Sequence, residues 1–167
     1  FHLIIFSEVT VIPGSDKFRF EITDNNGRKT VMLKGVIDED SNFTAIEKLG
    51  VPIYFNFKDI TAINSCGIRS WVNFLKEIGS TGIFYEECPP LIVRQMNMVP
   101  SFVGNAKALS VFTPYVCNEC ESEKLILVTR DHFEHGKISI EESFPCEFCK
   151  KGEMEIDVRA TLRDLSF

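Results

Sequence analysis

Four cysteines in the C-terminal third of the chain have the residue type and the spacing of metal ligands. They form two CxxC pairs, Cys117 with Cys120 and Cys146 with Cys149, separated by 25 residues. Each pair places two sulfurs on one tight turn, so two pairs can supply the four corners of a tetrahedral zinc site. Because protein sulfurs would fill all four corners, no open position is left for water. We therefore expect one structural zinc ion rather than a catalytic one.

Runs of β-favouring residues surround the two pairs and would bring them together. We expect strands at 124–129, 137–140 and 153–158. Paired CxxC turns between strands resemble the zinc-ribbon family, and the resemblance covers residues 115–158. It implies a small zinc-ribbon domain at 116–167, in which metal binding supplies folding free energy that so short a segment lacks in its own core.

Other uses of the cysteines are less well supported. The alternatives are two redox-active CxxC pairs, as in a thiol oxidoreductase, or two disulfides, and the flanking strands favour metal over either. We expect His132 and His135 to be exposed residues of a hairpin, because four cysteines already complete the ligand set. Cys88 has no CxxC partner and is expected to be buried and unreactive.

No arrangement of residues typical of an active site is recognisable. We find no carboxylate pair, no Ser-His-Asp combination, no glycine-rich phosphate loop and no open metal site with helical ligand spacing. We therefore expect a non-enzymatic protein. Binding of a lipid or another small ligand in the apolar layer of the fold is a further alternative.

A second candidate site is the segment 57–68, which leads from a strand into a helix through small polar residues. Backbone N–H groups at the start of a helix point outwards and attract anions, so this turn suits a phosphate or an acidic partner surface. The alternative is that Asn64 or Ser65 only caps the helix. Local chemistry alone favours the cap.

The elements that position these sites alternate between strand and helix. A period-two pattern at 18–22, a turn at 25–27 and an apolar run at 30–37 predict a β-hairpin. Apolar spacing predicts helices at 43–49, 68–78 and 90–98, and further strands at 51–57, 82–85 and 108–112. This order predicts an α/β fold, with a mixed sheet flanked by helices. Residues 1–16 would add an N-terminal strand or a tail.

The stretch 17–115 resembles a STAS domain, the fold shared by sulfate-transporter tails and anti-sigma-factor antagonists. The matching runs are 33–38, 57–60, 63–68 and 90–96. The third of these corresponds to the family's apolar residue, Asp-Ser-Ser-Gly and second apolar residue. The resemblance implies a STAS-like sheet and a role in signalling, in which this domain binds a regulatory protein such as an anti-sigma-factor-like kinase.

The resemblance also implies which residues meet the partner. In phospho-regulated members, a kinase that is also the anti-sigma factor phosphorylates the serine directly before the glycine, and the added charge breaks the docking surface. Here Cys66 stands in that position, Asn64 replaces the family's aspartate, and Ser65 lies one place early. We expect a partner-binding surface at Asn64, Ser65, Cys66, Gly67 and Arg69, with a serine phospho-switch that is lost or altered. Redox regulation at Cys66 is an alternative.

Composition and charge narrow the classes of partner. The 167 residues are 44% hydrophobic and 25% charged, which allows an apolar core without disulfides. The net charge is −6, and residues 115–167, with 7 lysines and arginines against 12 aspartates and glutamates, account for −5 of it. Because nucleic-acid binding needs a basic face, a zinc-ribbon nucleic-acid or transcription-associated protein is the alternative rather than the leading function.

The sequence does not indicate a membrane or secreted protein. No apolar run approaches the roughly 20 residues of a membrane span. The apolar start at 1–6 is short and lacks both a basic flank and a small-residue cleavage site, so it is not typical of a signal peptide. We expect a cytoplasmic protein, in which thiols stay reduced.

Overall fold

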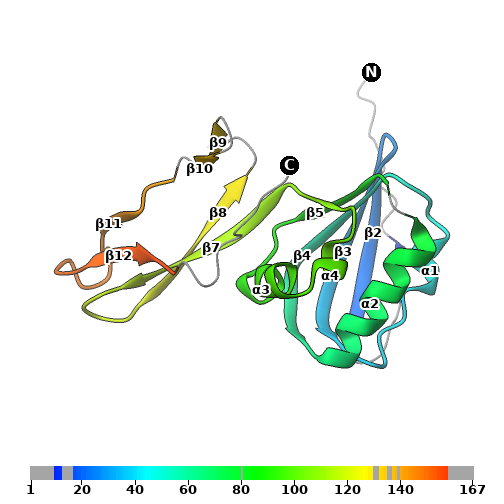
Figure 1. Cartoon of the computed structure of the whole chain (residues 1–167), viewed down its shortest axis with the longest axis horizontal. Coiled ribbons are helices and arrows are strands. Elements are labelled where there is room, and N and C mark those ends of the chain that lie inside the picture. Colours follow the sequence, from blue (N-terminus) through cyan, green and yellow to red (C-terminus); the bar gives the residue numbers. More distant parts are fainter. Residues whose placement is uncertain are drawn as a thin grey trace, which may run out of the picture.

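The chain folds into two main sheets (Figure 1). The computed structural model describes residues 10–12, 17–79, 81–129, 132–134, 137–138 and 140–157, with the backbone alone at 10–12, 133–134 and 137–138. Within these residues the first sheet has six strands, in the order β1 (Thr10–Ile12), β2 (Phe18–Asn25), β3 (Arg28–Ile37), β4 (Ile53–Ile63), β5 (Ile83–Glu86) and β6 (Lys107–Ala108). The second has four, in the order β11 (Ser143–Pro145), β12 (Glu153–Ile156), β7 (Ser110–Cys117) and β8 (Glu123–Thr129). A separate antiparallel pair is formed by β9 (Phe133–Glu134) and β10 (Lys137–Ile138).

The first sheet is mixed, as the sequence predicted. β2 and β3 form the expected antiparallel hairpin, and Asn26 and Gly27 make its turn with φ angles of 55° and 86°. Two residues in the left-handed region are typical of a two-residue hairpin turn, which explains the Asn-Gly sequence there. β1 pairs antiparallel with β2, whereas β3, β4, β5 and β6 run parallel to one another.

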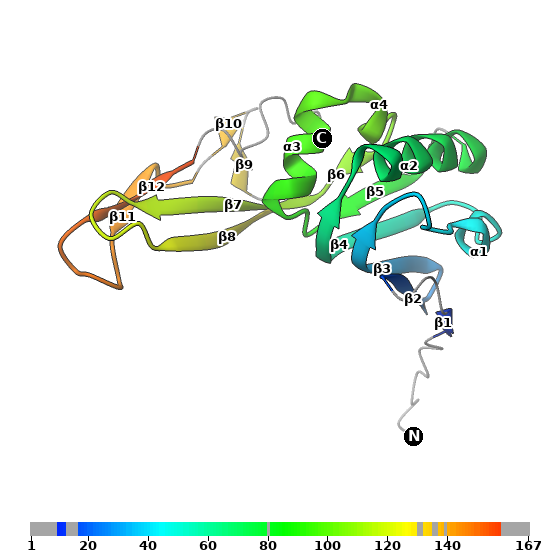
Figure 2. The ribbon, with the colours of Figure 1, turned by 90° about the horizontal axis from the view of Figure 1, so that it is seen from below.

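Helices connect the parallel strands and cover one face of this sheet. They are α1 (Thr44–Glu47), α2 (Ser65–Ile78), α3 (Pro90–Met98) and α4 (Pro100–Val103). In Figure 2, α2, α3 and α4 lie on the same side of the strands. Alternate side chains of β2 to β5 are buried, including Phe18, Phe20, Val31, Leu33, Phe55, Phe57 and Tyr85. None of the described helices combines the length and the apolar character needed to cross a membrane.

Aromatic rings fill the space between the sheet and its helices. Trp71 on α2 is fully buried, and its ring packs edge-on against Phe55 and Phe57 with centroids 5.0 and 5.3 Å away. Its Nε1 donates a hydrogen bond to the Tyr85 hydroxyl (2.9 Å), which donates in turn to the Phe102 carbonyl (2.8 Å). Burial raises the pKa of Tyr85 well above its usual range, so the hydroxyl remains a donor. Burying each such ring stabilises the fold by roughly 1.5–3 kcal/mol.

Several element boundaries differ from the predicted ones. β4 continues to Ile63 rather than ending at residue 57, because it pairs with β3 as far as Ile37, across two shifts in register. α2 then begins at Ser65, earlier than its periodic apolar residues indicate. The helix predicted at 43–49 is the single turn α1, and α4 and β11 were not predicted.

The single strand predicted at 108–112 is two strands in the structure, β6 and the start of β7. β7 continues from the first sheet into the second. β6 pairs with β5 in the first sheet, whereas β7 pairs with β8 and β12 in the second. The start of β7 still contacts the first sheet. The Cys88 N–H donates to the Ser110 carbonyl (3.1 Å), and the Phe112 N–H donates to the Cys88 carbonyl (2.8 Å). Cys88 is fully buried, as predicted, and the predicted domain boundary between residues 115 and 116 falls inside β7.

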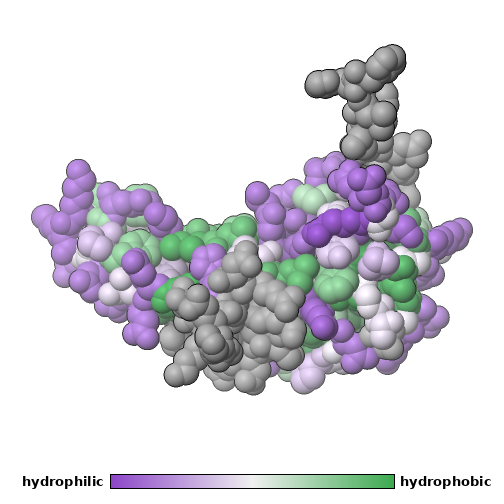
Figure 3. All heavy atoms as spheres, turned by 90° about the horizontal axis from the view of Figure 1, so that it is seen from above, coloured by the Kyte–Doolittle hydropathy of each residue, from purple (hydrophilic) through white to green (hydrophobic). Residues whose placement is uncertain are grey.

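The second sheet has a much smaller core. Among the described residues, its own cluster of buried residues consists of Tyr115, Cys117, Cys146 and Met154, whereas Val111 on β7 and Val128 on β8 are buried in the larger cluster of the first sheet. Figure 3 shows hydrophobic side chains gathered where the second sheet meets the first, and hydrophilic ones over the far end of the second sheet. The strands predicted at 124–129 and 153–158 correspond to β8 and β12, whereas the one at 137–140 corresponds to β10, which pairs with β9 instead.

Candidate metal centre

The two CxxC pairs lie at the turns of two hairpins. Residues 117–120 lead from β7 into β8, and residues 146–149 lead from β11 into β12. β12 pairs with β7, with Met154 opposite Cys117, so both turns reach the same end of the second sheet, far from the first sheet (Figure 1). Sheet topology therefore brings together cysteines that are 26 and 32 residues apart in the chain.

The two turns are built alike. In the first, the N–H of Glu121 donates to the Cys117 carbonyl, and in the second the N–H of Lys150 donates to the Cys146 carbonyl, both at 3.1 Å. Glu121 and Lys150 have φ angles of 58° and 57°, in the left-handed region, which costs a residue with a side chain about 1 kcal/mol or more. The two turns follow the same backbone path although their sequences differ. What they share is that each places two sulfurs on one side of the turn.

The four sulfurs form a compact cluster. All four Sγ atoms lie within 4.8 Å of one another, and they are 3.7 Å apart between Cys117 and Cys149 and 3.8 Å apart between Cys120 and Cys146. None of the six cysteines of the chain is in a disulfide. Cys117 and Cys146 are buried, Cys149 is half-buried and Cys120 is exposed. The structure thus brings the four predicted ligands together, in an arrangement that can hold a metal ion.

Backbone donors point at the sulfurs from both turns. Cys117 Sγ accepts hydrogen bonds from the N–H groups of Glu119 (3.4 Å) and Cys120 (3.5 Å). Cys149 Sγ accepts one from the N–H of Gly152 (3.4 Å). Donors of this kind stabilise a thiolate more than a neutral thiol, so the surroundings of the sulfurs suit metal-bound thiolates.

The thiols of the cluster differ in acidity. Hydrogen bonds from the side chain and the backbone of Ser122 lower the pKa of Cys120 to about 6. The backbone N–H of Cys149 lowers the pKa of Cys146. For Cys117, the backbone N–H of Cys120 also lowers the pKa, but burial and the neighbouring thiols outweigh it and raise the pKa to about 11. Both lowered pKa values favour the thiolate relative to an ordinary cysteine, and the thiolate is the form that binds metal ions.

Asn118 joins the two turns, a role that was not predicted. Its N–H donates to the Glu153 carbonyl and its Oδ1 accepts from the Glu153 N–H, both at 3.0 Å, while its Nδ2 donates to Glu155 (3.2 Å). Gly152 permits this approach, because a Cβ there would lie 2.6 Å from Asn118 Oδ1 and 2.7 Å from Glu119. The sequence shows an asparagine inside one CxxC pair and a glycine three residues after the other, but it does not indicate that the two residues meet.

His132 lies outside the cysteine cluster, as predicted. Its Nδ1 accepts a hydrogen bond from the Thr129 N–H (3.1 Å) at the end of β8. Its side chain is half-buried, whereas the sequence predicted an exposed residue. His135 lies outside the described residues.

At the second candidate site, Asn64 caps α2. Its Oδ1 accepts a hydrogen bond from the Gly67 N–H (2.7 Å), and its Nδ2 donates to Glu39 Oε2 (2.9 Å), which lowers the pKa of Glu39. Gly67 is buried against the end of β3, where a Cβ would lie 2.2 Å from the Ile37 carbonyl oxygen. Asn64 and Gly67 therefore have structural roles, the alternative that local chemistry favoured.

The other residues of the predicted partner surface face solvent. Ser65, Cys66 and Arg69 are exposed at the start of α2. Beside them lies a groove of about 500 Å³ between α1 and α2. Its described lining contains no lysine or arginine, and its acidic residues are Glu39, Asp40, Glu47 and Glu77. The partner itself stays a prediction.

No protein-family model and no curated protein matches the chain. The cluster of four cysteines is compatible with a zinc ribbon, and the first sheet has the expected α/β character. The STAS resemblance stays a prediction from its sequence motifs.

Proposed function

We propose that the chain is a non-enzymatic regulatory protein that binds a protein partner, and that one structural Zn²⁺ holds its second sheet together. The observation that carries the metal assignment is the spacing of the sulfurs. A regular tetrahedron around an ion with bonds of about 2.3 Å has edges of about 3.8 Å. The sulfurs are 3.7 Å apart between Cys117 and Cys149, and 3.8 Å apart between Cys120 and Cys146.

The ligand type favours zinc over other ions. Four thiolates in tetrahedral array hold zinc or iron, and zinc has no redox chemistry of its own. A closed shell of four sulfurs leaves no position for water or substrate, so the ion serves the fold. Such a shell needs reduced thiols, which supports a cytoplasmic location.

The first sheet and its helices bind the partner through the start of α2. Ser65, Cys66 and Arg69 are exposed on a helix end that Asn64 and Gly67 hold against the sheet. The STAS resemblance supports a regulatory protein of the anti-sigma-factor-kinase type, with the serine phospho-switch lost or altered at Cys66. The acidic groove beside this turn supports a partner with a basic docking surface, rather than the acidic surface that the helix start alone suggested.

Elemental analysis of the purified chain tests the metal assignment. We expect about one zinc per chain, and X-ray absorption should report sulfur ligands at about 2.3 Å. Cys146→Ser should lose the ion, whereas Cys88→Ser, a matched change at a buried cysteine of the first sheet, should keep it. A chain without stoichiometric metal that turns over disulfide substrates would instead support the thiol oxidoreductase.

Affinity purification of the tagged chain, followed by mass spectrometry, tests the partner. Cys66→Arg and Arg69→Glu should lose a protein that the wild type retains. Arg94→Glu is the matched control, because Arg94 is an exposed arginine on a different helix, α3. Recovery of the same proteins by all variants would remove the start of α2 as the docking surface.

A nucleic-acid-binding role for the second sheet is the second candidate. Phe148, with 57% of its surface exposed, lies within the second CxxC turn, and Lys150 and Lys151 follow it. An exposed ring beside two lysines suits base stacking and phosphate contact. Exposed glutamates outnumber the lysines around both turns, which disfavours this role: Glu119, Glu121, Glu123, Glu147, Glu153 and Glu155.

Fluorescence anisotropy with labelled single-stranded DNA and RNA separates the two candidates. Binding at physiological salt that is lost both in Phe148→Ala and after chelation of the metal would favour nucleic-acid recognition. We expect no such binding.

A further inference from the structure

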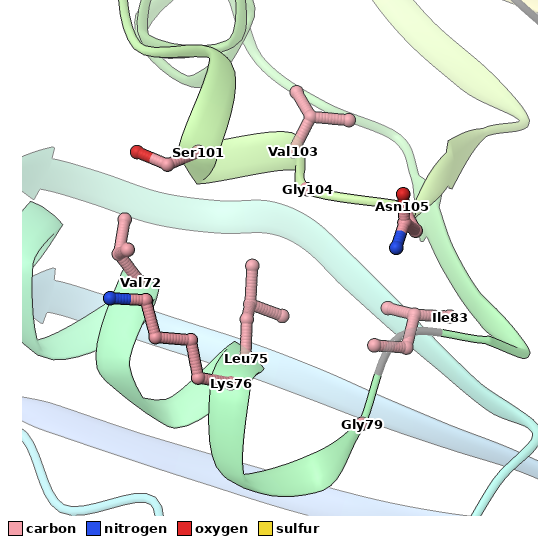
Figure 4. A pocket seen from close by; sticks show the side chains of 9 residues that line it. All are labelled: Val72, Leu75, Lys76, Gly79, Ile83, Ser101, Val103, Gly104 and Asn105. Atoms are coloured by element: carbon pink, nitrogen blue, oxygen red, sulfur yellow. The ribbon is translucent and has the colours of Figure 1, made fainter.

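A cavity of about 390 Å³ lies between the C-terminal half of α2 and the turn that contains α4 (Figure 4). Its walls are mainly apolar, and they come from Val72 and Leu75 on α2, Ile83 at the start of β5, and Val103 on α4. Figure 4 shows Leu75 pointing from α2 across the cavity towards the α4 segment. Apolar walls with a few polar groups, at a volume of 300–1,000 Å³, are typical of small-ligand sites.

The polar groups of the cavity favour a negatively charged occupant. Lys76 is the one charged residue of the described lining, and it forms no hydrogen bond or ion pair with another described residue. In Figure 4 the Lys76 amine and the Ser101 hydroxyl lie on the Val72 side, and the Asn105 amide lies on the Ile83 side. The described lining contains a lysine and no carboxylate, although the chain as a whole has a net charge of −6.

We propose that this cavity binds a short aliphatic monocarboxylate, a ligand site separate from the metal centre and the partner surface. The carboxylate contacts Lys76 and Ser101, and the alkyl chain covers Leu75 and Val103. A water molecule occupies about 30 Å³, so the cavity holds roughly a dozen non-hydrogen atoms, the size of octanoate or decanoate. Asn105 at the opposite end limits the length of the chain. The apolar walls disfavour a hydrated ion such as phosphate, which would lose its water without gaining enough polar partners.

An NMR titration of the full chain with sodium octanoate tests the proposal, with 1-octanol and inorganic phosphate as comparison probes. Octanoate should shift the methyl signals of Val72, Leu75, Ile83 and Val103. Octanol should bind more weakly because it lacks the charge, and phosphate should leave these signals in place because it lacks the alkyl chain.

Two kinds of variant separate the charge from the apolar walls. Lys76→Gln should weaken octanoate binding roughly fivefold, the effect of one solvent-exposed ion pair, and leave octanol binding unchanged. Lys76→Arg should restore the affinity, and Lys48→Gln, at an exposed lysine outside the cavity, should not alter it. Val72→Trp fills the cavity and should abolish binding of both ligands.

Three results would each overturn the proposal: no methyl shifts with octanoate, equal affinity for octanoate and octanol in the wild type, or equal octanoate affinity in the wild type and Lys76→Gln. The amide spectrum of each variant establishes that it is folded, so loss of binding in a folded Val72→Trp chain counts as evidence for the site.

Discussion

The two sheets achieve stability by different physical means. The first buries a continuous cluster of aromatic rings, with Phe55, Trp71 and Tyr85 fully enclosed between strands and helices. Among the described residues, the second has a separate buried cluster of its own that is much smaller, and two of its members, Cys117 and Cys146, are cysteines. A core that small cannot offset the conformational entropy lost when its strands become ordered. One chain thus combines a part that folds by apolar burial with a part that, as we propose, folds by binding metal.

Removal of a metal ligand should have the largest effect, and it tests whether the two sheets fold separately. We expect Cys146→Ser to lose the ion and unfold the second sheet while the first stays folded, because a structural zinc contributes about 10–16 kcal/mol to folding in small thiolate sites. Amide NMR signals of residues 143–157 should collapse, and those of β2 to β5 should keep their dispersion. Simultaneous unfolding of both sheets would mean that they form one cooperative unit.

The corresponding experiment on the first sheet removes a residue at the centre of its aromatic cluster. Trp71→Ala deletes a fully buried indole and should cost the first sheet about 3–5 kcal/mol. Urea denaturation followed by circular dichroism measures the loss, and zinc content should stay at the wild-type value. Phe148→Ala, at an exposed ring, is the control and should change stability little. Loss of zinc in a folded Trp71→Ala chain would contradict the separation of the two parts.

The contact between the two cysteine turns offers a finer test. In Gly152→Ala, the new methyl group would lie 2.6 Å from Asn118 Oδ1, so the Asn118 side chain must shift and its hydrogen bonds between the turns are strained. Overpacking of this kind costs about 1–3 kcal/mol, which should weaken zinc binding roughly tenfold. Competition with a chromophoric chelator measures the affinity. Lys151→Ala, at the exposed neighbour, should bind zinc as the wild type does.

A smaller effect is expected at the helix cap of the first sheet. Asn64→Ala removes the hydrogen bond from the Gly67 N–H and should cost about 1 kcal/mol. Ser65→Ala, at the adjacent exposed residue, should cost less. Denaturant midpoints at equal slope measure both. An equal loss of stability in the two variants would show that the hydrogen bond of the helix cap does not contribute measurably to stability.

The smallest expected effect concerns pH. The Asn64 amide lowers the pKa of Glu39 from its usual value of 4.5, so this interaction stabilises the folded chain above that pH, and the stabilisation is lost as the pH falls through the lowered value. In Asn64→Ala the Glu39 pKa should rise towards 4.5. An NMR titration of the Glu39 carboxyl carbon measures it, and an unchanged pKa would assign the shift to another cause.

Local signals predicted most of the first sheet. Asn26 and Gly27 make their hairpin turn, Gly79 follows the last residue of α2, and Pro90 is the first residue of α3. Each of these residue types favours the backbone conformation that its position requires, so the sequence alone indicates the turn or the helix end. The end of β4 carries no such signal. Lys58 and Asp59 are exposed, and what makes this segment a strand is its pairing with β3, which is remote in sequence.

The same division applies to the sites. Spacing alone identified the four cysteines, because a CxxC pair is a local feature. Asn118 and Gly152 meet only through the register of β12 on β7, which spacing does not encode. β11 is short and ends in Pro145, a residue that argues against a strand in sequence. The cavity depends on α4, whose four residues are too few to show periodicity.

The continuity of β7 has a mechanical consequence. This strand is hydrogen-bonded to Cys88 near its start and ends at Cys117. At about 3.3 Å per residue, it sets the cysteine-bearing tip roughly 23 Å away from the first sheet. Because successive side chains of a strand point to opposite sides, inserting a single residue within β7 would lengthen this reach by one step and turn the tip over. The length of β7 therefore determines both how far the tip extends and which way it faces.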